Sequence, residues 1–120
     1  MARFDRSAER IKRHRRIRKT ISGTRERPRL CVTKTLRHLY AQVIDDQAGQ
    51  TLVHVSTLDR EFREQASGPN VKTAEAMGAV LAARALEKGV DTVVFDRGGH
   101  PYHGVISAFA EACRKGGLRF

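Results

Sequence analysis

Polar and apolar side chains alternate along the chain after residue 29, in the pattern of strands that bury one face. Residues 30–35 form the first such stretch, which is rich in β-branched side chains, and residues 37–44 form the second. A polar turn with a glycine at residues 45–49 leads into a third extended stretch at residues 51–56. Because the connections are short, we expect a three-strand antiparallel meander.

The second half of the chain changes to a helical period. After a polar segment at residues 58–70, apolar side chains in residues 71–88 recur every three or four positions, and Asn70 is suited to cap that helix. Residues 92–95 are a short, wholly apolar run, typical of a strand that is covered on both faces. Residues 106–113 then predict a second amphipathic helix. We therefore expect an α/β fold in which a helix–strand–helix unit packs on a mixed sheet.

Charge divides the chain into two parts. Among its 120 residues, the first 29 hold twelve Lys and Arg but three acidic side chains, whereas the remaining 91 are nearly balanced with eleven basic and ten acidic ones. We therefore predict a basic arm over residues 1–26 and a compact domain over residues 27–120. A net charge of +10 favours a polyanionic partner. The longest uncharged apolar stretch has eight residues, Ala76–Ala83, so we expect no membrane span and no secretory signal.

The arm has helix-forming residues from Ser7 to Ile21, without Gly or Pro. Its basic side chains point in every direction around such a helix, so self-repulsion should fray it until a polyanion orders it. A solvated tail that aids solubility is the second interpretation, and a localisation signal or membrane-surface helix is the third. The side chains predicted to bind RNA in the arm are Arg10, Lys12, Arg13, His14, Arg15, Arg16, Arg18 and Lys19.

One face of the predicted sheet offers a second candidate RNA surface. Leu39, Ala41 and Val43 share the apolar face of their strand, whereas His38 and Tyr40 lie on the other face. Lys34 and Arg37 come just before them, around the turn. An exposed sheet face with aromatic and basic side chains suits RNA, although a merely solvated sheet face is common.

A glycine-rich loop at residues 96–104 follows the short apolar run, at the end of a strand where α/β sheets bind ligands. It matches neither of the two common phosphate-binding glycine motifs. We interpret Asp96 as a cap for local amides and Tyr102 as packed under the loop. For Arg97 and His103, phosphate contact and a purely structural role remain equally open.

Catalytic and metal chemistry have weak support. His100 and His103 lack an obvious third ligand, so we predict no metal. Neither Cys31 nor Cys113 has the neighbours of a nucleophile, and no catalytic residue or cofactor is predicted. The enzyme alternative is a small Mg²⁺-dependent nuclease that uses three strand-end carboxylates, Asp45, Asp46 and Asp96.

Eight short segments, in order along nearly the whole chain, resemble the bacterial large-subunit ribosomal protein family L-eighteen, which binds 5S rRNA. The segments are ISGT (21–24), RPRL (27–30), HLYAQVIDD (38–46), GQTL (49–52), STLD (56–59), VVFDRGG (93–99), YHG (102–104) and GLRF (117–120). Val105, His100 and Cys31 depart from the family pattern, which usually has Arg, an aromatic residue and Ser there.

The resemblance implies a non-enzymatic cytoplasmic protein of the ribosome that binds 5S rRNA and helps attach it to 23S rRNA in the central protuberance. It also implies contact with a neighbouring 5S-binding protein, no small-molecule substrate, and an arm that is poorly ordered when free. RNA contacts of the family map onto the arm from Arg10 to Lys19, and onto Arg27, Arg29, Lys34, Arg37, His38 and Tyr40.

Overall fold

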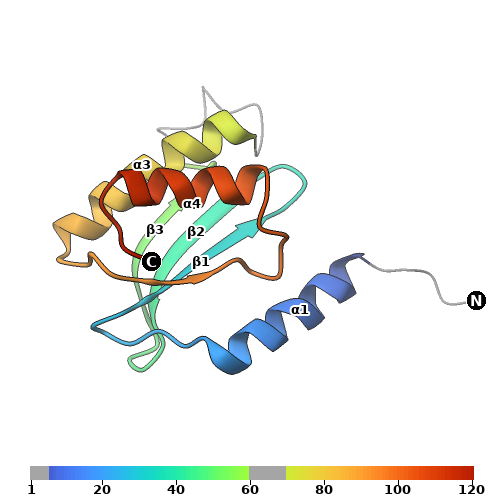
Figure 1. Ribbon diagram of the computed structural model, residues 1–120, viewed down its shortest axis with the longest axis horizontal. Coiled ribbons are helices and arrows are strands. Elements are labelled where there is room, and N and C mark those ends of the chain that lie inside the picture. Colours follow the sequence, from blue (N-terminus) through green and yellow to red (C-terminus); the bar gives the residue numbers. More distant parts are fainter. Residues whose placement is uncertain (1–5, 60–69) are drawn as a thin grey trace, which may run out of the picture.

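A four-stranded mixed sheet forms the centre of the protein (Figure 1). A computed structural model describes residues 6–59 and 70–120. The strands β1 (Arg29–Lys34), β2 (Leu39–Asp45), β3 (Gln50–Ser56) and β4 (Val94–Asp96) lie in the order β3-β2-β1-β4. The first three pair antiparallel, and β4 pairs parallel with β1. The predicted meander and mixed sheet are therefore confirmed.

Two helices, α3 (Val71–Glu87) and α4 (Val105–Lys115), cover one face of this sheet (Figure 1). The α3 helix begins as predicted, because the Asn70 carboxamide oxygen accepts the Thr73 N–H at 2.8 Å. A Cβ on Gly78 would lie 2.6 Å from the Ala112 Cβ, so only glycine permits this close approach of α3 to α4. Their buried side chains and the apolar face of β1, β2 and β3 form one core.

The short strand β4 is an edge strand and is less covered than its apolar sequence predicts. Val94 and Phe95 are half-buried, and within the apolar run of residues 92–95 the fully buried side chain is that of Val93, just before the strand. The reason is that β4 lies at the edge of the sheet and pairs with β1, while the Phe120 and Tyr102 rings pack against Phe95. Tyr102 is itself 42% exposed, so it does not pack under the loop as expected.

The helix α1 (Arg6–Thr20) lies apart from α3 and α4 (Figure 1). None of its fifteen described residues is buried, so it contributes nothing to the core. Most of the polar segment predicted at residues 58–70 falls outside the described residues. Among the helices that the structure describes, none is long and apolar enough to cross a membrane.

Candidate nucleic-acid interface

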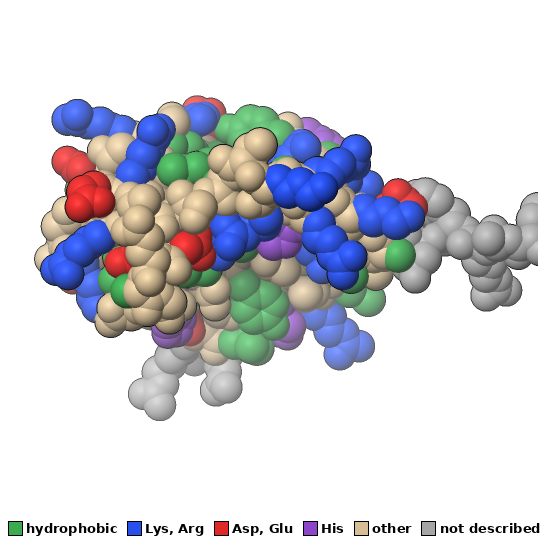
Figure 2. Space-filling view, turned by 90° about the horizontal axis from the view of Figure 1, so that it is seen from below, with side chains coloured by type: hydrophobic (Ala, Val, Ile, Leu, Met, Phe, Trp, Pro, Cys, Tyr) green, Lys and Arg blue, Asp and Glu red, His purple; other side chains and the backbone are tan. Residues whose placement is uncertain are grey.

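The basic side chains of α1 are divided between two sides of the helix. The four on the outward side are exposed and recur at positions i, i+3, i+4 and i+7; we call them the outward stripe, Lys12, Arg15, Arg16 and Lys19. Apart from Arg6, which is exposed in the first turn, those on the other side are half-buried; we call the half-buried ones the inward face, Arg10, Arg13, His14 and Arg18. Seen from below, Lys and Arg side chains gather on the side of the molecule where α1 lies (Figure 2).

The inward face is bonded to the loop that follows β4. Arg10 Nη1 donates to the Gly98 carbonyl oxygen at 2.9 Å, and Arg13 Nε donates to that of Gly99 at 2.8 Å. His14 Nε2 lies 2.9 Å from Asp96 Oδ2. Sequence reasoning placed these basic side chains against RNA, whereas here they meet acceptors within the chain.

Next to this contact, Arg29 joins two carboxylates. Its Nη1 donates to Asp96 Oδ2 at 2.8 Å, while its Nε and Nη2 donate to the two oxygens of Asp46 at 3.0 and 3.1 Å. Arg29 is only 8% exposed and Asp96 is fully buried. The guanidinium predicted to contact RNA is therefore committed to carboxylates inside the protein. Arg18 also reaches Asp46, with its Nη1 3.4 Å from Oδ2.

These contacts shift the pKa values of the charged groups. The Arg29 hydrogen bonds are the main cause that lowers the pKa of Asp46 to about 2. Burial acts to raise the pKa of Asp96, but hydrogen bonds from the Gly98 N–H, His14 and Arg29 outweigh it, and the net shift is downward. For Arg29, burial acts to lower the pKa. The hydrogen bonds to the Asp46 and Asp96 carboxylates have the larger combined effect, and the net shift is upward. All three groups are thus held in their charged forms.

Three possible metal ligands lie together here. Nitrogen, sulfur and oxygen atoms of His14, Cys31 and Asp96 are all within 4.8 Å of one another. The Arg29 guanidinium, however, already bonds the same Asp96 oxygen that faces His14. Burial and the nearby Asp96 charge also raise the pKa of the Cys31 thiol, which disfavours the thiolate that a metal needs. The Arg29 guanidinium thus already supplies positive charge to this carboxylate.

The three carboxylates of the nuclease alternative have structural partners. Asp45 Oδ1 accepts the N–H groups of Gln47 and Ala48 and so closes the β2–β3 turn. Asp46 and Asp96 are neutralised by Arg29. As predicted, Asp96 also caps a local amide, since its Oδ1 accepts the Gly98 N–H at 2.9 Å.

The face of the sheet opposite α3 and α4 carries the second candidate surface. Tyr40 is half-buried there, and its ring lies 6.1 Å from the His38 ring. His38 Nδ1 is 3.0 Å from the Thr57 hydroxyl, which fixes the imidazole. Lys34 and Arg37 are exposed in and beside the β1–β2 hairpin. Exposed charge and a partly accessible aromatic ring therefore lie together at this end of the sheet, as the sequence predicted.

The loop beyond Gly99 meets this hairpin through His100. Its Nε2 accepts the Lys34 N–H at 3.0 Å, and burial, together with Arg10 and Lys34, lowers the pKa of His100 to about 4. His100 is therefore a neutral acceptor at pH 7. Arg97 is half-buried and His103 is exposed, so both open interpretations of these side chains remain.

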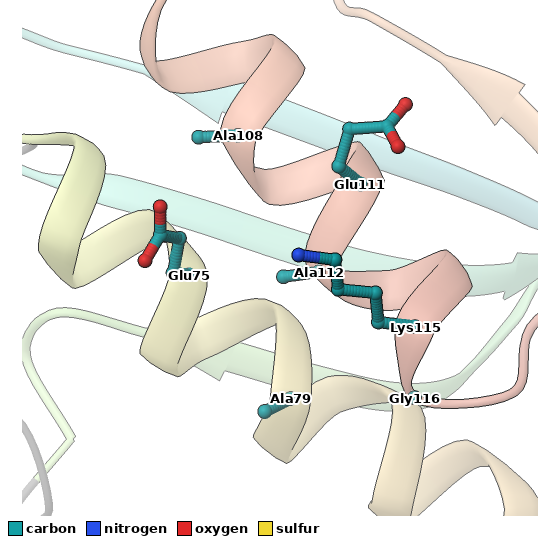
Figure 3. A pocket seen from close by; sticks show the side chains of 7 residues that line it. All are labelled: Glu75, Ala79, Ala108, Glu111, Ala112, Lys115 and Gly116. Atoms are coloured by element: carbon teal, nitrogen blue, oxygen red, sulfur yellow. The ribbon is translucent and has the colours of Figure 1, made fainter.

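An open groove between α3 and α4 lies on another side of the molecule (Figure 3). Its floor is made of the small residues Ala79, Ala108, Ala112 and Gly116. Glu75, Glu111 and Lys115 stand at its rim (Figure 3). With charges of both signs and more acidic than basic groups, it does not extend the basic surface.

Comparison with known proteins agrees with the sequence resemblance. The family described as "Ribosomal L18 of archaea, bacteria, mitoch. and chloroplast" matches residues 4–120. Proteins named large ribosomal subunit protein uL18 are similar over nearly their whole length. The one from Heliobacterium modesticaldum is 56% identical over 118 residues, covering 98% of this chain and 97% of its own. The one from Aquifex aeolicus is 55% identical, covering 96% and 95%.

These matches decide between the two function classes. Proteins of this family are structural components of the ribosome, in the cytoplasm of bacteria, and the nuclease alternative is wrong. Its carboxylates close a turn and bind arginine, as the geometry shows. The chain belongs to the L18 family of large-subunit ribosomal proteins.

Proposed function

We propose that this protein binds 5S rRNA and helps attach it to 23S rRNA in the central protuberance of the large subunit, beside another 5S-binding protein. The observation that carries the proposal is the outward stripe, since four exposed cations on one side of α1 match the spaced phosphates of an RNA backbone. The family assignment supports it, because a protein of the large subunit is surrounded by rRNA.

Three further exposed cations extend this surface onto the domain: Arg27, Lys34 and Arg37. If roughly half of these seven side chains contact phosphates, log K should fall with log salt with a slope of about −3. Such contacts give affinity but little selectivity. We assign selectivity to the sheet face around Tyr40, where a base can stack on the ring.

We also propose the division into an arm over residues 1–26 and a compact domain over residues 27–120. The last part of the arm already contacts the domain: the Gly23 N–H donates to Asp46 Oδ2 at 2.6 Å. A truncation that tests the division should therefore end at residue 20, before these contacts.

Binding to 5S rRNA is tested against a folded control RNA of the same length, with a salt titration for each. We expect the protein to bind 5S rRNA at least tenfold more tightly, and to leave both RNAs intact with Mg²⁺ present. Equal affinity for the two RNAs would refute the 5S assignment. For the attachment step, immobilised 5S rRNA should retain a 23S rRNA fragment only when the protein is present.

A further inference from the structure

A large apolar side chain is exposed to water at the tip of the β1–β2 hairpin. Leu36 is 92% exposed, whereas the next most exposed large hydrophobic side chain in the described part of the chain, that of Leu58, is 49% exposed. The loop that joins β1 to β2 projects from one end of the sheet (Figure 1). Because a single exposed leucine is common on protein surfaces, the case for a function rests on what surrounds it.

The fold itself gives no reason for a leucine at this position. The hairpin tip, residues 35–38, is closed by two hydrogen bonds. The Thr35 N–H donates to the His38 carbonyl oxygen at 2.9 Å, and the His38 N–H donates to Thr35 Oγ1 at 3.1 Å. Neither bond involves Leu36. Its φ is not positive, so the backbone here also suits the polar residues that usually occupy turns.

Cations and two aromatic rings accompany this leucine. Lys34 and Arg37 are exposed on either side of it in the sequence. His38 follows, with its ring 6.1 Å from the Tyr40 ring. We propose that Leu36 is an apolar anchor that packs against an unpaired base of the RNA, while Lys34 and Arg37 bind the phosphates beside it. This inference rests on the proposed 5S rRNA binding and names a contact within it.

The charge along the hairpin favours RNA over a protein as the partner of the tip. Residues 30–44 include Lys34 and Arg37 but no acidic side chain, which suits a polyanion. RNA also supplies the apolar half of the contact, because bases in loops and bulges are unstacked and expose flat faces that proteins recognise. Insertion of side chains such as leucine between bases is an established device of nucleic-acid-binding proteins.

The tip is held firmly enough to act as an anchor. At its base, the Leu39 N–H donates to the Thr57 hydroxyl at 3.2 Å, and the Thr57 N–H donates to the Leu39 carbonyl oxygen at 3.1 Å. On the β1 side, His100 Nε2 accepts the Lys34 N–H. None of these contacts involves α1, so the anchor is present whether or not the arm is ordered. An anchor that is fixed beforehand loses little conformational entropy on binding, which strengthens the complex.

Leu36→Ala tests the anchor without removing a charge. We expect the variant to bind 5S rRNA roughly tenfold more weakly than wild type, because it buries less apolar surface in the complex. The slope of log K against log salt should stay the same, since no phosphate contact is removed. The thermal melt should also be unchanged, because so exposed a side chain adds almost no buried surface to the fold.

Two further variants serve as controls for this measurement. Leu86→Ala shortens a leucine that is 43% exposed in the last turn of α3, and should leave the affinity for 5S rRNA unchanged. Arg37→Gln removes a charge next to Leu36, and should make the salt slope shallower by about one unit. The pair separates loss of an apolar contact from loss of a phosphate contact.

A cation at the tip distinguishes a base contact from a backbone contact. If the tip faced only phosphates, Leu36→Lys would add a contact, tighten binding and steepen the salt slope by about one unit. If Leu36 packs against a base, the substitution removes the apolar contact. We then expect Leu36→Lys to bind severalfold more weakly than wild type at high salt, where the added charge is screened.

Wild-type affinity of Leu36→Ala for 5S rRNA would overturn the inference, and so would tighter binding of Leu36→Lys at high salt. If Leu36→Ala binds 5S rRNA normally but no longer joins the neighbouring 5S-binding protein, the tip is a protein contact and the inference is equally wrong. A wild type without preference for 5S rRNA refutes the proposed function instead. In that case, the comparison of wild type with Leu36→Ala on either RNA still decides whether the tip makes an apolar contact.

Discussion

Replacing Arg29 by glutamine is predicted to cost the protein a large part of its stability. The change removes a cation that contacts both Asp46 and Asp96, and the fully buried Asp96 carboxylate then depends on weaker partners such as the Gly98 N–H and His14. Breaking a buried ion pair costs about 3–5 kcal/mol. Because Asp46 is partly exposed and keeps the Gly23 N–H, we expect a value near the lower end, about 3 kcal/mol.

Urea denaturation measures this loss. With a slope of about 1.5 kcal/mol per molar urea, a loss of about 3 kcal/mol moves the midpoint down by roughly 2 M. Glu111→Gln is the control, since its carboxylate lies at the same 2.8 Å from an arginine nitrogen, Arg114 Nη1, but the side chain is 57% exposed. That exposed pair should contribute less than about 1 kcal/mol.

The result that refutes the reasoning is an Arg29→Gln variant no less stable than the Glu111→Gln control. Salt titration of RNA binding adds an independent readout. A buried guanidinium neutralises no phosphate, so the slope of log K against log salt should be the same for Arg29→Gln and wild type. A slope about one unit shallower would instead place Arg29 on the RNA.

Three more outcomes are expected. Deleting residues 1–20 removes the four cations of the outward stripe, so it should make the salt slope shallower by about 2 units while the domain stays folded in a thermal melt; an unchanged slope would mean that the arm is only a solvated tail. Tyr40→Ala should weaken 5S rRNA binding by about 1–3 kcal/mol if a base stacks on the ring, and unchanged affinity with a lower melting temperature would contradict stacking. Because the pKa of Asp46 is lowered to about 2 from 3.8, its stabilising contribution is complete above pH 4 and is lost as the pH falls towards 2. Asp46→Asn should therefore flatten the fall of the melting temperature over that range.

Local patterns in the sequence were enough to predict most of the fold. Alternation separated the two faces of β2, and a period of three to four residues located α3 and α4. The environment of β4 could not be predicted in this way, because an apolar run of a few residues has the same pattern at the centre of a sheet as at its edge. Its burial depends on β1 and on Phe120, which are distant in sequence.

The candidate site was predicted only as a set of charges. In α1, arginine and lysine occur on every side, so nothing local distinguishes Arg13, which bonds the loop, from Arg16, which is exposed. That division is made by acceptors more than eighty residues away. The same holds for Arg29, whose sequence neighbours are typical of RNA-binding segments, but whose partner Asp96 is 67 positions further on.

The separation in sequence between α1 and the loop that follows β4 also orders events during synthesis. Arg10 and its acceptor, the Gly98 carbonyl oxygen, are 88 positions apart, so the helix is made long before the loop exists. At a synthesis rate of about 5–20 residues per second, roughly 4–18 s pass between the addition of Arg10 and the addition of Gly98. Throughout that time Arg10 and Arg13 lack their acceptors and are as available to solution polyanions as the outward stripe. Completion of β4 and its loop therefore reduces the number of cations that nonspecific RNA can bind, and the nascent chain should associate with RNA less selectively than the finished protein.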